Sequence, residues 1–187
     1  MLVGVDEVGR GSWAGPLLVV AAQLIGAMPD GLRDSKLLSR QQRDAIYELL
    51  STNCQFGEGW VQPEEIDTYG LAQAMRMGVN RALVALGADL EAEIIIDGNI
   101  NYCPVEFINA RCEIKADNNH PIVSAASIYA KVTRDAYMTK ISRFYPNYRF
   151  EKHVGYGTKL HRDILARFGV SALHRKSYKP IQALLQT

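Results

Sequence analysis

The sequence has little cysteine and no cysteine pair. Its 187 residues include three cysteines, Cys54, Cys103 and Cys112, and no two of them form a CxxC motif. An odd number at these spacings does not make a disulfide framework, a zinc finger or a haem-attachment site. We therefore expect reduced thiols in a cytoplasmic protein.

A long hydrophobic run is missing as well. The longest apolar stretch, 14–28, is interrupted by Pro16, Gln23 and Gly26 and is shorter than the ~20 residues of a membrane-spanning helix. The N-terminus carries Asp6 and Glu7 where a secretory signal would carry positive charge and then an apolar run. Neither a membrane protein nor a secreted one is expected. With 48% hydrophobic and 22% charged residues, the composition is that of one globular domain, 1–187.

Net charge is nearly absent, at +1, but the N-terminal and C-terminal parts of the chain carry opposite net charges. Residues 1–130 hold 9 Lys and Arg against 17 Asp and Glu, whereas residues 131–187 hold 12 against 3. Aromatic residues lie among the cations of the second part, a mixture that suits the phosphates and bases of nucleic acid. A basic helical surface packed on an acidic one would give the same counts, so charge alone leaves both interpretations open.

Hydrophobic periodicity predicts a mixed α/β domain with strands early and helices late. Strands are expected at 2–6, 17–25, 54–62, 93–96, 105–108 and 112–115. Helices are expected after a capping box at Ser39 and Gln42, over 63–86 with a break near Gly70, from 122 to about 144, at 158–168 and near 180–185. The basic residues of about 145–187 therefore fall in a helical part.

Acidic residues stand where the predicted strands end. Asp6 and Glu7 close the first strand, Asp97 closes the strand at 93–96, and Asp117 follows the strand at 112–115. Acids at the ends of neighbouring strands can meet at one edge of a sheet. Clustered carboxylates are stable at neutral pH only with cations among them. Oxygen ligands indicate Mg²⁺ or Mn²⁺, and a pair of such ions is the usual arrangement for displacement at phosphorus.

Simpler interpretations of these residues stay open. Each acid taken singly is more typical of a turn or a helix cap. Adjacent residues of a regular strand face opposite sides, so Asp6 and Glu7 reach one centre only if the strand bends near Gly9 or Glu7 uses its carbonyl. The Gly-rich stretch GRGSWAG at 9–15 lacks the GKS or GKT ending of a phosphate-binding loop.

Eight short motifs follow one another along the chain: DEVGRG at 6–11, AGP at 14–16, DSK at 34–36, DGN at 97–99, KAD at 115–117, SAASIYAKVTRD at 124–135, GYGT at 155–158 and HRKSY at 174–178. Together they resemble the bacterial ribonuclease HII family over nearly the whole chain. The resemblance implies the ribonuclease H-like fold, a mixed central sheet flanked by helices with a helical C-terminal part. It also implies hydrolysis of RNA in RNA–DNA hybrids and nicking on the 5′ side of ribonucleotides embedded in duplex DNA. The products would carry 5′-phosphate and 3′-hydroxyl ends.

The matching motifs imply roles for individual residues. The catalytic set, which would bind two Mn²⁺ or Mg²⁺ ions, is Asp6, Glu7, Asp97 and Asp117. The motif whose backbone reads the ribonucleotide 2′-hydroxyl is Gly9, Arg10 and Gly11. Tyr156 of GYGT matches the tyrosine that packs on that sugar, and Lys36 is a candidate phosphate contact. The implied substrates are RNA–DNA hybrids and duplex DNA that contains ribonucleotides.

The chain departs from the family pattern at a few positions. Val154 precedes GYGT where the family often has Lys, and Tyr178 stands where Phe is commoner, a change that we expect to be tolerated. The end IQALLQT lacks the paired aromatics of a clamp-binding tail, and DEVGRG instead of DESGKG argues against ribonuclease HIII. We expect a monomer.

Other polar residues have structural explanations. Asp135 lies beside Lys131 and Arg134 within the matching helix motif, which favours an ion pair on a helix surface over a metal ligand. His174 and Arg175 are expected to support the fold or contact a DNA backbone. The histidines have no metal-binding spacing, and solvated or capping roles are expected for His120, His153, His161 and His174. Two rival functions are a non-catalytic hybrid-binding module and an Asp-dependent phosphatase or ATPase, although neither a nucleophilic Asp motif nor a phosphate loop is present.

Overall fold

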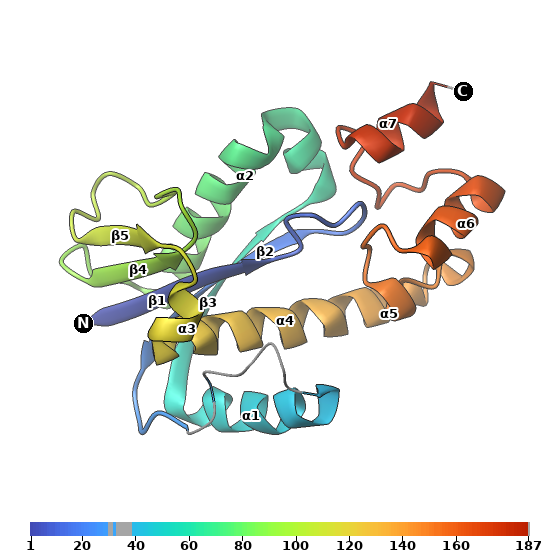
Figure 1. Cartoon of the computed structure of the whole chain (residues 1–187). Helices are drawn as coiled ribbons and strands as arrows, with labels where there is room; N and C mark the ends of the chain where they lie inside the picture. Colours follow the sequence, from blue (N-terminus) through green and yellow to red (C-terminus); the bar gives the residue numbers. More distant parts are fainter. Residues whose placement is uncertain (30–31, 33–38, 187) are drawn as a thin grey trace.

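A computed structural model describes residues 1–29, 32 and 39–186 and arranges them around a five-stranded mixed sheet (Figure 1). The strands are β1 (Leu2–Val8), β2 (Leu17–Leu24), β3 (Cys54–Val61), β4 (Glu93–Asp97) and β5 (Ala110–Glu113), in the order β3-β2-β1-β4-β5. The pairs β1–β2 and β2–β3 are antiparallel, whereas β1–β4 and β4–β5 are parallel. The mixed central sheet expected from the sequence is confirmed.

Helices cover both faces of the sheet and form the C-terminal part (Figure 1). They are α1 (Arg40–Asn53), α2 (Pro63–Leu86), α3 (Ala116–Asn119), α4 (Pro121–Ser142), the 3₁₀ helix η2 (Pro146–Tyr148), α5 (Phe150–His153), α6 (Lys159–Phe168) and α7 (Lys179–Leu185). Helix α2 lies on one face, and α4 with α1 lies on the other. Helices α5 to α7 follow the far end of α4.

The apolar run of β2 has no polar alternation because both of its faces are covered. Its odd-numbered residues 17–21 pack in the core under α2, and its even-numbered residues 18–22 pack in the core under α4. Helix α4 also lies directly on β1, since a Cβ atom at Gly4 would stand 2.6 Å from the backbone of Ile122. This close contact places the residues of α4 next to the end of β1.

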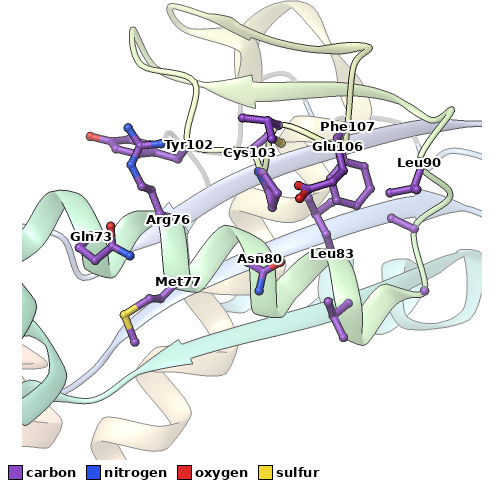
Figure 2. A pocket seen from close by; sticks show the side chains of 15 residues that line it. Gln73, Arg76, Met77, Asn80, Leu83, Leu90, Tyr102, Cys103, Glu106 and Phe107 are labelled. Atoms are coloured by element: carbon purple, nitrogen blue, oxygen red, sulfur yellow. The ribbon is translucent and has the colours of Figure 1, made fainter.

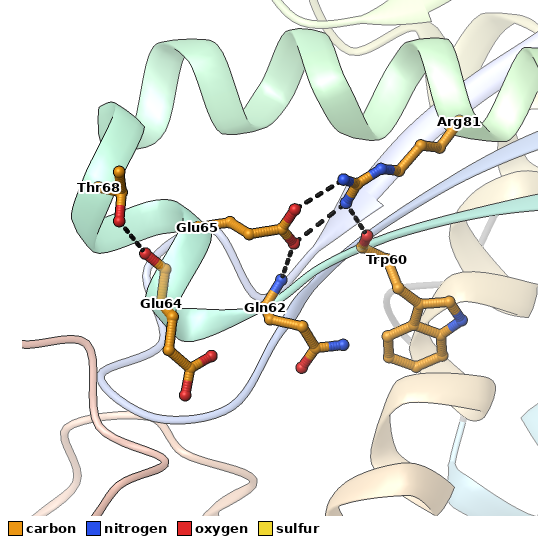
Figure 3. Close-up of polar contacts among 6 residues, drawn as sticks. All are labelled: Trp60, Gln62, Glu64, Glu65, Thr68 and Arg81. Carbon is orange, nitrogen blue, oxygen red and sulfur yellow. Dashed lines mark hydrogen bonds and ion pairs between the residues drawn. The ribbon is translucent and has the colours of Figure 1, made fainter.

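The break expected near Gly70 is confirmed, because Gly70 has a φ of +78° inside α2. An ion pair joins the two halves of the helix across this kink (Figure 3). Arg81 Nη2 lies 2.6 Å from Glu65 Oε1, and Arg81 Nη1 donates to the carbonyl of Trp60 at 2.6 Å. The hydrogen bond from Arg81 to the Glu65 carboxylate lowers the pKa of Glu65. The first half of α2 is thereby held against the end of β3.

The capping box at Ser39 and Gln42 and the long helices are confirmed, but two strand predictions are wrong. Residues 105–108 form turns instead of a strand, because the N–H of Phe107 bonds locally to the carbonyl of Pro104. The strand expected at 112–115 lies at 110–113, where its pairing with β4 sets the register. Strand β1 continues to Val8, past the predicted end at residue 6.

Candidate active site

Parallel pairing of β1 and β4 brings two of the predicted acids together. Val5 is the partner of Ile96, so Asp6 and Asp97 follow on neighbouring strands at the same end of the sheet. Asp6 is only 7% exposed. Its pKa is raised to about 8, first by burial and then by the charges of Glu7 and Asp97. These three carboxylates therefore share one electrostatic site.

Glu7 leaves the strand on the opposite side from Asp6. Strand β1 stays paired with β2 through Val8, and Val8 packs in the core under α4, so the strand alternation puts Asp6 on that side as well. Glu7 Oε1 lies 3.6 Å from Arg10 Nη1. Burial raises the pKa of Glu7, and Arg10 lowers it. A bend of β1 before Gly9 is not seen, although Glu7 still lies within electrostatic reach of Asp97.

Asp97 connects the sheet to the short helix that carries Asp117. Its Oδ1 accepts a hydrogen bond of 2.8 Å from the N–H of Ala116. Asp117, the next residue, is 2% exposed, and the hydroxyl of Ser124 on α4 donates to its carbonyl. Over residues 1–29, 32 and 39–186, no three His, Cys, Asp or Glu side chains form a group that could hold a metal ion as they stand.

Two serines of the SAAS motif contact the predicted acids, a contact that the sequence analysis did not identify. Ser127 hydrogen-bonds the Asp6 carboxylate, and Ser124 binds the carbonyl of Asp117. They lie three residues apart on α4, which is the spacing that puts two side chains on one helix face. The spacing of these two serines within the motif SAASIYAKVTRD was the sequence signal that could have identified them.

The GRG motif forms an exposed turn. The N–H of Ser12 donates to the carbonyl of Gly9 at 3.2 Å, so Arg10 and Gly11 are the central residues of a four-residue turn. Gly9 has a φ of +87°, and a Cβ atom there would stand 2.4 Å from Arg134 Nε. At Gly11 a Cβ atom would meet nothing within 4 Å. The turn is therefore packed on one side and open on the other.

Tyr156 lies in a loop that is bound to the residues after this turn. The N–H of Trp13 donates to the carbonyl of Gly155 at 2.8 Å. The Arg134 guanidinium lies 5.7 Å from the centre of the Tyr156 ring. The structure thus brings the GRG and GYGT motifs together. Lys36 lies outside the described residues.

Two fully buried arginines hold these loops, a role that the sequence analysis missed for Arg134. The Arg134 guanidinium donates to the carbonyl of Pro16 at 2.8 Å and to that of Val154 at 2.9 Å, joining the two loops. Arg175 donates to the carbonyl of Gly15 at 2.9 Å. The expectation that Arg175 supports the fold is confirmed, and its complete burial removes a contact with DNA.

The solvated or capping roles expected for His153, His161 and His174 are wrong, whereas the expectation that His174 supports the fold is confirmed. His153, His161 and His174 are buried and packed against one another, with 3.0 Å between the Nε2 atoms of His161 and His174. Only tertiary packing decides this, since nothing in their sequence spacing distinguishes them from surface histidines. His120 begins α4 and pairs with Glu113 at 2.8 Å.

The surface ion pair expected at Asp135 is confirmed for Lys131, at 2.9 Å, but not for Arg134, which is buried and donates to carbonyls. An open cavity of about 770 Å³ lies elsewhere, between α2 and the 102–107 loop (Figure 2). None of the predicted site residues lines it. The acids and the two loops, rather than this cavity, make the candidate site.

Comparison with known proteins identifies the family of the chain. The family model described as Ribonuclease HII matches residues 3–181. The chain belongs to the ribonuclease HII family. The ribonuclease HII of Coxiella burnetii strain RSA 493 is 40% identical over 186 residues, which cover 98% of this chain and 91% of that protein. Ribonuclease HII enzymes cleave the RNA of RNA–DNA hybrids, so the chain is a nuclease and a hydrolase.

Solved structures confirm the ribonuclease H-like fold. The ribonuclease HII of Archaeoglobus fulgidus, solved in complex with PCNA, has a TM-score of 0.79 and 24% identity, covering 100% of this chain and 98% of that chain. Bst-RNase HIII, solved in complex with Mn²⁺, has a TM-score of 0.72 and 22% identity, covering 99% of this chain and 69% of that chain. No helix within the described residues is long and apolar enough to cross a membrane.

Proposed function

We propose that this ribonuclease HII chain is a metal-dependent endonuclease that nicks duplex DNA on the 5′ side of embedded ribonucleotides and also hydrolyses RNA in long hybrids. The observation that carries the proposal is the pairing of β1 with β4, which sets Asp6 beside Asp97 at one end of the sheet. The exposed GRG turn follows directly from β1. The groups that we propose recognise the sugar therefore follow within a few residues of Asp6 and Glu7, which we propose bind the metal ions at the scissile phosphate.

The four proposed catalytic acids suit a hard divalent cation. Asp6, Glu7, Asp97 and Asp117 offer carboxylate oxygens only, which is the chemistry that Mg²⁺ and Mn²⁺ prefer. Burial and then the charges of Glu7 and Asp97 raise the pKa of Asp6, and the positive charge of a bound cation would offset the repulsion among these carboxylates. We propose that these residues hold two ions in the reacting complex.

The bound ions would supply activation of the attacking water and neutralisation of the charge on the leaving 3′-oxygen. The chain's own residues fix where this happens. Ser127 orients the Asp6 carboxylate, and the N–H of Ala116 orients that of Asp97. Cleavage then leaves a 5′-phosphate and a 3′-hydroxyl.

Recognition of the ribonucleotide is assigned to the turn and the neighbouring tyrosine. The open side of Gly11 lets the backbone approach a sugar, and a backbone N–H can bind the 2′-hydroxyl that distinguishes RNA from DNA. Tyr156 would pack on that sugar, and Lys36 would contact a phosphate. We further propose that the chain acts as a cytoplasmic monomer, with 1–187 as one catalytic domain and 145–187 as its basic substrate-binding part.

The test is cleavage of labelled duplex DNA that carries one ribonucleotide, in Mg²⁺, in Mn²⁺ and in chelator, with the cut mapped to the nucleotide. We expect a nick on the 5′ side of the ribonucleotide that disappears in chelator. Cleavage of long hybrids without this nick would remove the junction role of the GRG turn and Tyr156. Salt-sensitive binding without any cleavage would favour the rival binding module.

A pair of variants tests the acids. Asp97→Asn should lower the cleavage rate about a hundredfold or more while hybrid binding stays measurable, because Asp97 is assigned to the metal and not to the phosphate. Asp135→Asn is the matched control, since Asp135 pairs with Lys131 on α4. Equal rates for the two variants would contradict the proposed site.

A further inference from the structure

The C-terminal segment 173–178 is bound along the loop that carries the GRG turn. The N–H of Arg175 donates to the carbonyl of Trp13 at 2.8 Å, and the N–H of Gly15 donates to the carbonyl of Leu173 at 2.8 Å. Two side chains of this segment then reach back past the loop to the turn itself. These contacts join residues that are about 160 positions apart in the sequence.

Both side chains bind the same carbonyl. Arg175 Nη1 donates to the carbonyl oxygen of Arg10 at 3.2 Å, and the Tyr178 hydroxyl donates to it at 2.6 Å. Arg175 Nη1 also donates to the Tyr178 hydroxyl oxygen at 2.9 Å, so the two donors are fixed relative to each other. A carbonyl has two lone pairs, and here each has a donor.

Holding this carbonyl fixes the peptide that joins Arg10 to Gly11. The peptide is planar and trans, so its N–H points away from its C=O. With the carbonyl of Arg10 directed at Arg175 and Tyr178, the N–H of Gly11 is directed away from the C-terminal segment. That is the exposed centre of the turn, where Gly11 leaves open space.

We propose that Arg175 and Tyr178 are positioning residues for sugar recognition, which set the direction of the Gly11 N–H toward a ribonucleotide 2′-oxygen. The inference rests on the proposed function. Tyr178 was expected to be a tolerated replacement for Phe, yet its hydroxyl makes the shorter of the two hydrogen bonds to Arg10. Phe at this position would leave Arg175 as the remaining one of these two donors.

The test compares Tyr178→Phe with wild type in the presence of the metal that supports cleavage. The KM for a duplex with one ribonucleotide is measured together with the Ki of the same duplex made entirely of DNA, used as a competitive inhibitor. We expect Tyr178→Phe to lower the ratio Ki/KM about two- to tenfold, the value of one hydrogen bond. The Ki itself should not change, because the all-DNA duplex has no 2′-hydroxyl to lose.

A matched control is Tyr129→Phe, which removes a tyrosine hydroxyl that donates to the Glu58 carboxylate at 3.0 Å, between α4 and β3 and outside the proposed substrate-binding part. Its Ki/KM should equal that of wild type. Arg175→Lys removes the forked donor and should lower the ratio further than Tyr178→Phe.

Three outcomes overturn the inference. The first is an unchanged ratio in both Tyr178→Phe and Arg175→Lys, and the second is a parallel rise of KM and Ki, which indicates only a structural role. The third is an equal fall of the ratio in Tyr129→Phe. Failure of the proposed function is distinct from all three, because wild type itself would then not cleave the ribonucleotide duplex.

Discussion

Two glycines of one turn have different physical reasons to be glycine. Gly9 has a φ of +87° and lies against the buried Arg134 side chain, so the fold itself requires it. Gly11 has no such neighbour, and its open space faces outward. The sequence suggested one reason for both, close approach to a sugar. At Gly11 that reason stays a prediction, whereas Gly9 has an internal one.

Alanine at each position separates these reasons. Gly9→Ala should lower the free energy of unfolding by about 1–3 kcal/mol, because it combines a left-handed backbone with a contact to Arg134. Gly11→Ala should leave stability within about 0.5 kcal/mol of wild type and still reduce cleavage at a single ribonucleotide. Urea unfolding and the nicking assay measure the two effects. Equal destabilisation by both substitutions would show that the turn is uniformly packed.

At the scale of elements, the kinked first half of α2 supports the C-terminal segment. The Asp67 carboxylate accepts hydrogen bonds from the N–H of Lys176 at 2.8 Å, the N–H of Ser177 at 2.8 Å and the Ser177 hydroxyl at 2.6 Å. Arg81 and Glu65 hold this half of α2 across the kink. The chain of contacts therefore runs from α2 through residues 175–178 to the GRG turn.

Asp67→Ala should destabilise the protein by about 1–2 kcal/mol, because three donors lose a charged acceptor. It should also expose residues 171–178 to limited proteolysis. Asp163→Ala is the control, since Asp163 makes an exposed pair with Lys159 on α6, and such pairs contribute about 0–1 kcal/mol. Similar urea midpoints and similar cleavage patterns for the two variants would contradict this role of Asp67.

The elements also show what the sequence could predict. Apolar runs that end on Asp6 and Asp97 predicted acids at a common edge, because strand ends are a local pattern and parallel neighbours align them. Residues 105–108 looked like a strand, yet Val105 is 89% exposed and their hydrogen bonds are local. The role of Arg175 could not be predicted in this detail, since its partners are carbonyls far away in the sequence.

At the scale of the molecule, the basic C-terminal part is not all surface charge. Arg134 and Arg175 are fully buried and bind carbonyls, so they do not add to a surface that meets a polyanion. Part of the charge asymmetry therefore comes from buried residues that hold the fold, and neither a surface for a polyanion nor a solvated helical surface accounts for all of it. The other cations of 131–187 lie on α4 and along the segments that follow it, and those after α4 stay candidates for phosphate contacts.

Two of the three buried histidines, His161 and His174, are hydrogen-bonded to each other in an arrangement that requires neutral rings, and the ring of His153 stacks on that of His161. His161 Nδ1 donates to the carbonyl of Tyr156 at 3.0 Å, since a carbonyl can only accept. His161 Nε2 then accepts from His174 Nε2, and His174 Nδ1 accepts from the N–H of Ser171 at 2.9 Å. Burial lowers the pKa of both His161 and His174 to about 4, and it also lowers the pKa of His153. A proton on His161 Nε2 would place two donors face to face.

This group predicts a loss of stability in acid. The unfolded chain binds protons at histidine near pH 6.5, whereas folded His161 and His174 do not until about pH 4, so stability is complete above pH 6.5 and falls between the two values. From pH 7 to pH 5 each of these two rings should cost about 1–2 kcal/mol. Urea unfolding of wild type and His174→Phe across this range measures the slope of free energy against pH. This slope measures how many more protons the unfolded chain binds than the folded one, and it should fall by up to one proton in His174→Phe. Identical slopes would show that His174 titrates alike in the folded and unfolded states.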